Sequence, residues 1–181
     1  MKKALCTLSI LGALVFLSCE KETTFLITEN SVGPLSKSTP TSDLDALFAA
    51  DSIVRDTTMA QIGANNTKVE IFEKGGQHLL TLTSNTDSIP KITNVRIMDS
   101  RYKTEKGIGL KSTFGDIQRQ YTIKKIVTTL SSIVIFPRES NLYFTIDKEE
   151  LPADLRFTRT DIEAVQIPHE AKIKYLMLGW E

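Results

Sequence analysis

The chain has 181 residues, of which 41% are hydrophobic and 24% are charged, and its 22 Lys and Arg residues balance its 22 Asp and Glu residues. This length and composition suit one globular domain, or two small ones that share a core, and exclude a chain that is disordered throughout. The balanced charge lacks the basic excess that nucleic-acid binding requires, so we expect no nucleic acid among the partners. Two cysteines and two histidines leave little material for a zinc site or for thiol chemistry.

The N-terminus has the pattern of a bacterial lipoprotein signal peptide. Residues 1–3 carry two lysines and precede an apolar run over residues 4–17, which is too short to span a bilayer comfortably. The run ends in Ser18-Cys19, which resembles a lipobox, where the cysteine is lipidated and becomes the first residue after cleavage. We therefore predict a signal peptide over residues 1–18 and a lipid anchor at Cys19. The alternative is an ordinary signal peptide with a coincidental cysteine.

Cleavage after residue 18 would leave 20 basic against 22 acidic residues and no thiol besides that of Cys19. We therefore expect neither a disulfide nor cysteine catalysis. The residue after Cys19 is Glu20 rather than the Asp that favours inner-membrane retention, so we expect an outer-membrane protein. Acidic residues at this place also resemble the surface-export signals of Bacteroidetes lipoproteins, whereas the alternative is a solvated tether. Both a periplasmic and a surface-facing location stay open.

The rest of the chain contains an ordered series of internal similarities. Two glycine-containing segments that share Lys-Ser-Thr each precede a short amphipathic segment with apolar residues at i and i+4. Strand-like runs follow, each with a turn and a return strand, as in hairpins. The matched segments are 32–39 with 107–113, 43–48 with 116–121, 69–72 with 133–136, 79–83 with 142–146, and 92–98 with 173–178.

This series predicts an α+β fold, a tandem repeat of a short helix plus antiparallel β-strands forming a twisted sheet. We assign residues 19–31 to a tether and first strand, 32–100 to one repeat unit and 101–181 to the second, within one compact domain. Thr39 and Thr113 are the expected helix N-caps, and Trp180 is expected to close the core rather than to stack on a sugar. The expected core residues are Leu44, Phe48, Ile71, Leu80, Ile117, Tyr121, Ile135, Phe144 and Met177.

Two long segments are the expected contact surfaces for a partner, Ala49–Lys68 and Lys148–Gln166. Connections of this length are uncommon unless they have a function or local structure. The linker over residues 99–106 also carries a basic cluster of Arg101, Lys103 and Lys106. A solvated surface explains that cluster better than an anion site does.

No familiar catalytic motif is present in the sequence, and we predict no catalytic, cofactor-binding or metal site. The segment 107–113 has the glycines and lysine of a phosphate loop without its spacing, so a turn and a helix cap are expected there. His78 and His169 have no neighbours at metal-ligand spacing and are expected at the surface. Carboxylate pairs such as Asp43–Asp45 and Glu149–Glu150 could serve a glycosidase, but their separation in space does not follow from the sequence.

Several of these motifs together resemble the RpoE-regulated envelope lipoprotein family of Gram-negative bacteria, whose members have no assigned activity. The resemblance is carried by the lipobox, by Val32-Gly33-Pro34-Leu35 with Ser38-Thr39-Pro40, and by Ile97-Met98-Asp99-Ser100 leading to residues 107–117. It covers about Thr28–Ile117, and the family's C-terminal cysteines have no counterpart here. The shared motifs are turns and caps, so they imply a shared fold more than shared chemistry.

From the anchor and the missing catalytic motifs we expect a lipid-anchored envelope protein that is not an enzyme. It would bind or scaffold an envelope protein or glycan without a cofactor, because a broad sheet suits such partners better than a small substrate. The alternative is a carboxylate-dependent enzyme acting on an envelope polymer.

Overall fold

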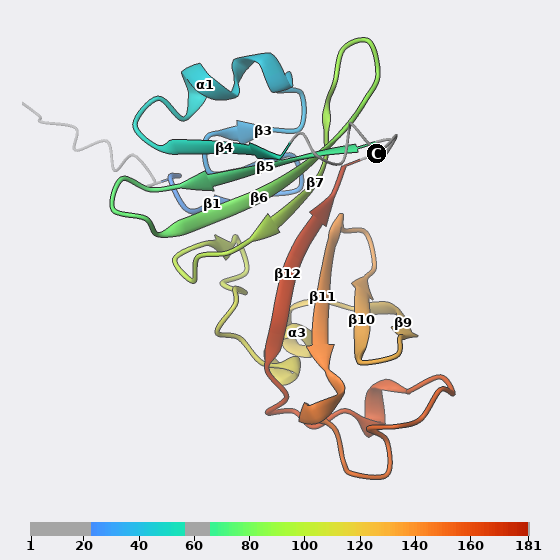
Figure 1. Ribbon diagram of the computed structural model, residues 1–181. Helices are drawn as coiled ribbons and strands as arrows, with labels where there is room; N and C mark the ends of the chain where they lie inside the picture. Colours follow the sequence, from blue (N-terminus) through green and yellow to red (C-terminus); the bar gives the residue numbers. More distant parts are fainter. Residues whose placement is uncertain (1–22, 57–65, 181) are drawn as a thin grey trace, which may run out of the picture.

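The computed structural model describes residues 23–56 and 66–180, so the predicted signal peptide and Cys19 lie outside the described residues. Within the described part the strands form two sheets (Figure 1). The smaller sheet has the order β3-β2-β1-β8 and consists of β1 (Leu26–Ile27), β2 (Ser31–Val32), β3 (Leu35–Ser36) and β8 (Lys103–Thr104).

The larger sheet has eight strands among the described residues and is antiparallel throughout. Two four-stranded meanders, β4–β7 and β9–β12, meet edge to edge where β7 pairs with β12. The expected hairpin turns at residues 74–77 and 138–141 are present. In sheet order the strands are β4 (Ser52–Asp56), β5 (Asn66–Phe72), β6 (His78–Asn85), β7 (Ile92–Ile97), β12 (Ile173–Gly179), β11 (Leu142–Asp147), β10 (Ser132–Pro137) and β9 (Ile123–Thr128).

The predicted α+β fold class is wrong, because the described structure is mostly β. Its α-helices, α1 (Leu44–Leu47) and α3 (Phe114–Gln120), span four and seven residues, and the 3₁₀ turns η1 (Thr41–Asp43), η2 (Lys148–Glu150) and η3 (Ala164–Gln166) span three each. The prediction also missed β4 and β9, the two edges of the larger sheet. Edge strands bury little, and β9 exposes Lys124 and Lys125 side by side, so neither strand shows a clean alternation. The molecule is therefore not a repeat of helix-plus-strand units.

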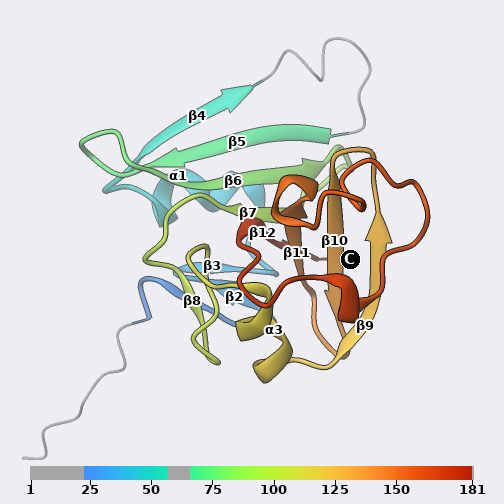
Figure 2. The same ribbon diagram turned by 90° about the horizontal axis from the view of Figure 1, so that it is seen from below.

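The core lies on one side of the larger sheet, where α1, α3, the smaller sheet and the segment 148–166 pack against it (Figure 2). Met177, expected in the core, is half-buried on the opposite face, because its neighbours Leu176 and Leu178 occupy the inward positions of β12. Tyr121 is half-buried against the core. The other expected core residues are confirmed as buried, namely Leu44, Phe48, Ile71, Leu80, Ile117, Ile135, Phe144 and Trp180.

Only one of the two expected threonine caps forms. Thr113 caps α3 in a reciprocal capping box with Asp116: the Asp116 N–H donates to Thr113 Oγ1 at 3.3 Å, and the Thr113 N–H donates to Asp116 Oδ2 at 2.8 Å. Thr39 is not a helix cap. Its Oγ1 accepts a hydrogen bond from the Ser36 N–H at 3.1 Å, and the helical turn begins after Pro40.

Candidate functional site

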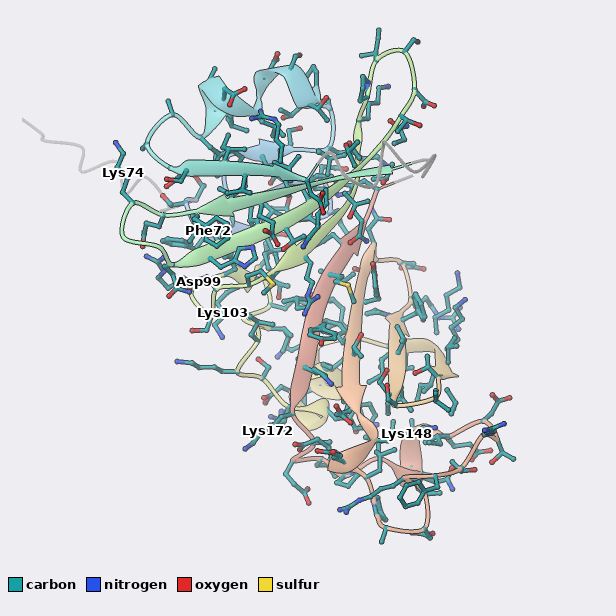
Figure 3. All side chains as sticks on the ribbon, in the orientation of Figure 1. Phe72, Lys74, Asp99, Lys103, Lys148 and Lys172 are labelled. Carbon is teal, nitrogen blue, oxygen red and sulfur yellow. The ribbon has the colours of Figure 1, made fainter. Side chains whose placement is uncertain are left out.

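The side of the larger sheet opposite the core carries no packed helix or sheet among the described residues, and we call it the open face. Residues alternate between the two sides along each strand. In β7, Val95 and Ile97 are buried in the core, so Arg96 between them points to the open face. In Figure 3 this face is toward the reader, with α3 behind the strands.

One row of side chains crosses the centre of the open face, set by strand register. Arg96 pairs with Thr81 on one side and with Met177 on the other, and Met177 pairs in turn with Tyr143. Beyond β11, Phe136 pairs with Lys125. From β7 to β9 this row spans four strand spacings, or roughly 19 Å. We call the set of Arg96, Tyr175, Met177, Tyr143, Phe136 and Lys125 the aromatic–cation row.

At one end of the row, two aromatic rings stack beneath a lysine. The rings of Phe136 and Tyr143 have centroids 5.7 Å apart and lie within 18° of parallel. The Lys125 Nζ atom lies 4.6 Å from the centroid of the Phe136 ring. The Tyr143 hydroxyl accepts a hydrogen bond from the Asn94 amide, and burial raises the pKa of Tyr143. The phenol therefore stays protonated at neutral pH, and its own O–H can donate to a ligand.

At the other end, the Arg96 guanidinium lies over the Tyr175 ring. Its Cζ atom is 3.7 Å from the centroid of the Tyr175 ring. The Arg96 Nε atom is buried and has no hydrogen-bond partner in the described structure. A cation–π contact of this kind contributes about 0.5–1 kcal/mol at an exposed site. Tyr175 thus contacts the guanidinium through its ring face, and this contact fills none of the guanidinium's hydrogen-bond donors.

The two cations of the row differ from neighbouring lysines on the same sheet, which have acidic partners. Lys174 pairs with Asp147 at 2.5 Å and Lys68 pairs with Glu70 at 2.6 Å. The hydrogen bond from Lys174 holds the pKa of Asp147 below its usual value. Among the described residues no acidic group pairs with Arg96 or Lys125. The row is therefore a local site of uncompensated positive charge set among aromatic rings.

The structure describes only part of the first expected contact segment and the whole of the second. Ala49–Lys68 contains β4, and its residues 57–65 lie outside the described part. Lys148–Gln166 wraps the far end of the second meander, where Figure 3 shows Lys148. Lys148 is buried, and its Nζ atom donates to the carbonyl oxygens of Thr158 at 2.6 Å and Leu130 at 3.4 Å. This lysine fixes the segment against the β9–β10 turn.

The basic cluster of the 99–106 linker serves the fold. Arg101 bonds to Asp99 at 2.9 Å and to Glu73 at 3.0 Å, which ties the linker to the β5–β6 turn. Burial acts to raise the pKa of Asp99, but hydrogen bonds from Arg101 outweigh it and hold that pKa below its usual value. Lys106 donates to the Gln120 carbonyl oxygen at 2.9 Å, and Lys103 lies in β8. Groups of the protein itself therefore engage Arg101 and Lys106, which argues against an anion site and assigns these two residues a structural role in place of a solvated surface.

The remaining candidates from the sequence do not come together in a site. His78 is half-buried and stacks on Phe72 with ring centroids 4.4 Å apart, while His169 is exposed. Asp45 pairs with Arg55, and Glu150 accepts a hydrogen bond from the Lys172 N–H. Among the described residues no group of three or more His, Cys, Asp or Glu side chains could hold a metal ion. In the same part of the chain, no helix is long and apolar enough to cross a membrane.

The aromatic–cation row was not found from the sequence, although part of its signal is visible there. The alternation in β11 places Tyr143 outward, and Arg96 stands between two aliphatic residues of β7 in the same way. The row depends on the pairing of β7 with β12, which are about 80 residues apart in the chain, and local alternation does not give that pairing.

Comparison with known proteins gives a match to a solved structure. No family model matches the sequence, and no curated protein sequence is similar to it. The fold is similar to that of the uncharacterized protein yfeY from Escherichia coli, with a TM-score of 0.53 and 15% sequence identity over 83% of this chain and 97% of that one. At this identity the similarity extends to the fold alone. The chain thus has the fold of an uncharacterized bacterial protein.

Proposed function

We propose that this protein is a lipid-anchored, non-catalytic lipoprotein of the outer membrane that binds an acidic glycan of the cell envelope through the aromatic–cation row. The observation that carries the proposal is the pair Arg96 and Lys125, each held against an aromatic ring and without an acidic partner among the described residues. A bound anion would supply the missing counter-charge. On the motifs quoted above, we also propose membership of the RpoE-regulated envelope lipoprotein family.

The character of the row favours a glycan over a protein partner. Protein interfaces depend on large apolar or aromatic anchors that enter pockets of the partner. In the row, Phe136, Tyr143, Tyr175 and Met177 are half-buried, and polar groups lie between them. The most exposed large apolar side chains of the described structure, Leu130, Phe157 and Val165, lie elsewhere. A long, flat strip that combines ring surfaces with hydrogen-bond donors suits an extended, charged sugar chain.

The anchor is tested by lipid labelling in cells. We expect a fatty-acid probe to label the wild-type protein and to leave a Cys19→Ala variant unlabelled, because the cysteine thiol is the only acceptor that the lipobox offers. Gel mobility and fractionation of the two forms give a second measurement, since the variant should leave the membrane fraction. Equal labelling of both forms would contradict the anchor without affecting the glycan site.

Binding is tested with a uronic-acid polymer, polygalacturonate, and with neutral dextran as the matched uncharged polymer. We expect the protein to be retarded in gels that contain polygalacturonate and to migrate unchanged in gels that contain dextran. The double variant R96Q/K125Q should bind about tenfold or more weakly, because each charge-assisted contact is worth roughly 1.5–3 kcal/mol. Lys125 is exposed and Arg96 is half-buried on the open face, outside the core, so the fold should be retained.

A second double variant, K74Q/K124Q, loses the same charge at exposed lysines outside the row and should bind like wild type. Equal loss in both double variants would mean non-specific attraction and would contradict the site. Cleavage of the polymer, abolished by replacing a carboxylate pair, would instead support the enzyme alternative. Binding to an envelope protein with no retardation by polygalacturonate would replace the glycan with a protein partner.

A further inference from the structure

A second possible site lies away from the open face, in a cleft of about 700 Å³ between the smaller sheet and the β6–β7 end of the larger one. This volume is in the range of small-molecule sites. The C-terminal Trp180 and Ile92 give the cleft an apolar floor. The other lining residues are polar, and they are Asn30, Ser36, Lys37, Ser38, Asn85, Lys91 and Thr93.

The floor of the cleft is rigid. The Trp180 side chain is 2% exposed, and its Nε1–H donates to the Glu29 carbonyl oxygen at 3.1 Å. The Trp180 backbone N–H donates to the Thr93 carbonyl oxygen at 2.7 Å. Across the cleft, the backbone N–H of Lys37 donates to the Asn30 carbonyl oxygen at 2.8 Å. A ligand would therefore meet a site that is already formed.

The charged side chains that line the cleft among the described residues are both positive. Lys37 and Lys91 both line it, and no aspartate or glutamate among the described residues does. No acidic partner of either lysine exists among the described residues. The adjacent acid, Asp87, accepts a hydrogen bond from the Asn85 amide at 2.6 Å. The Thr93 hydroxyl donates to the Thr83 carbonyl oxygen at 3.2 Å, and the Ser36 and Ser38 hydroxyls bond to each other at 3.0 Å, so one serine hydroxyl keeps its proton for a negatively charged group.

The type of these donors distinguishes between anions. A carboxylate is best matched by the planar fork of arginine, and the cleft has none. Lysine acts as a point charge, and together with hydroxyl and amide donors it is a common way to hold the oxygens of a phosphate. Trp180 and Ile92, each 2% exposed, form the apolar base of the cleft beneath the organic body that carries this phosphate.

We propose that this cleft binds a phosphate ester of a small organic molecule, with Lys37 and Lys91 holding the phosphate and Trp180 beneath its organic part. The ester could be a soluble phosphate or the headgroup of a phospholipid, and both present the same chemistry. This site is independent of the glycan site on the open face.

The chain provides its own probe, because Trp180 is the only tryptophan in the sequence. We expect its fluorescence to change saturably when glycerol 3-phosphate is added and to remain constant with glycerol, the matched uncharged compound. Inorganic phosphate should compete. The double variant K37Q/K91Q should bind at least about tenfold more weakly, whereas K74Q/K124Q, with the same loss of charge elsewhere, should bind like wild type.

Vesicles separate the two sources of the ester. A response to phosphatidylglycerol vesicles that is lost in K37Q/K91Q, with no response to glycerol 3-phosphate, would assign the site to a lipid headgroup. A response to glycerol 3-phosphate that is lost in K37Q/K91Q would assign it to a soluble ester. Absence of any saturable response to glycerol 3-phosphate and to both vesicle types, phosphatidylglycerol and phosphatidylcholine, would overturn the proposal. Equal binding by K37Q/K91Q and wild type would also overturn it. Neither result would affect the polygalacturonate assay, which reports on Arg96 and Lys125.

Discussion

Replacing Phe144 by alanine is expected to lower the free energy of unfolding by about 3–5 kcal/mol, a large share of a typical domain's stability. The Phe144 side chain is completely buried in β11, where it pairs with Leu176 of β12 and Ile135 of β10. The Tyr121 ring lies 6.1 Å away, centroid to centroid, and joins it to the end of α3. Truncation would leave a cavity between sheet and helix that rigid neighbours fill only in part.

Urea unfolding followed by Trp180 fluorescence measures this loss, and Phe136→Ala is the matched control. Phe136 is the same residue type on the adjacent strand, but its half-buried ring lies on the open face. We expect its truncation to cost less than half as much, because water can replace the missing ring. Similar losses in the two variants would mean that the core does not lie on one side of the sheet only.

The local sequence pattern was sufficient to predict the regular elements that have one buried and one exposed side. β11 alternates as expected, with Leu142, Phe144 and Ile146 inward, and its hairpin with β10 follows from the turn at residues 138–141. The helix at residues 114–120 follows from the Thr113–Asp116 capping pair. In these segments propensity, capping and burial all favour the same structure.

The sequence pattern did not predict most of the elements that are very short or that bury few side chains. The strands of the smaller sheet have two residues each, which is too short for any periodicity, and only β1 lies in a segment, 19–31, where a strand was expected. The similarity between segments was interpreted as repeated helices, yet α1 spans only four residues before Phe48 and a turn lead into β4. A turn of helix packed on a large sheet does not make an α+β fold.

The two candidate sites depend on contacts that the sequence separates. The open-face row needs β7 beside β12 before Arg96 can meet Tyr175. The cleft needs the C-terminal Trp180 to reach the loop around Lys37. The Lys-Ser-Thr motif at residues 37–39 predicts a repeat and a helix cap. Its lysine and Ser38 contribute instead to the cleft wall, a role that follows only from tertiary packing.

The Gly33→Ala substitution is expected to destabilise the protein by about 2–3 kcal/mol, because two penalties act at one position. Gly33 lies in the turn between β2 and β3 with φ of +55°, a conformation that costs alanine about 1 kcal/mol or more. A Cβ atom there would lie 2.5 Å from the Thr24 carbonyl oxygen, so the backbone would have to move. The shift would displace the loop that bears Ser36 and Lys37, and we expect weaker glycerol 3-phosphate binding as well.

The Gly107→Ala variant is the control for Gly33→Ala, because only one of the two penalties applies to it. Gly107 has φ of +79°, but a Cβ atom there would meet no atom within 4 Å, so only the backbone conformation is penalised. We expect a loss of about 1 kcal/mol for this variant in urea unfolding, with binding to the cleft unchanged. The difference between the variants then measures the contact of Gly33 with Thr24. Equal losses of unfolding free energy in the two variants would show that the backbone near Gly33 moves away from the new Cβ atom at no cost. The Val32-Gly33-Pro34-Leu35 motif would then require glycine only for its positive φ.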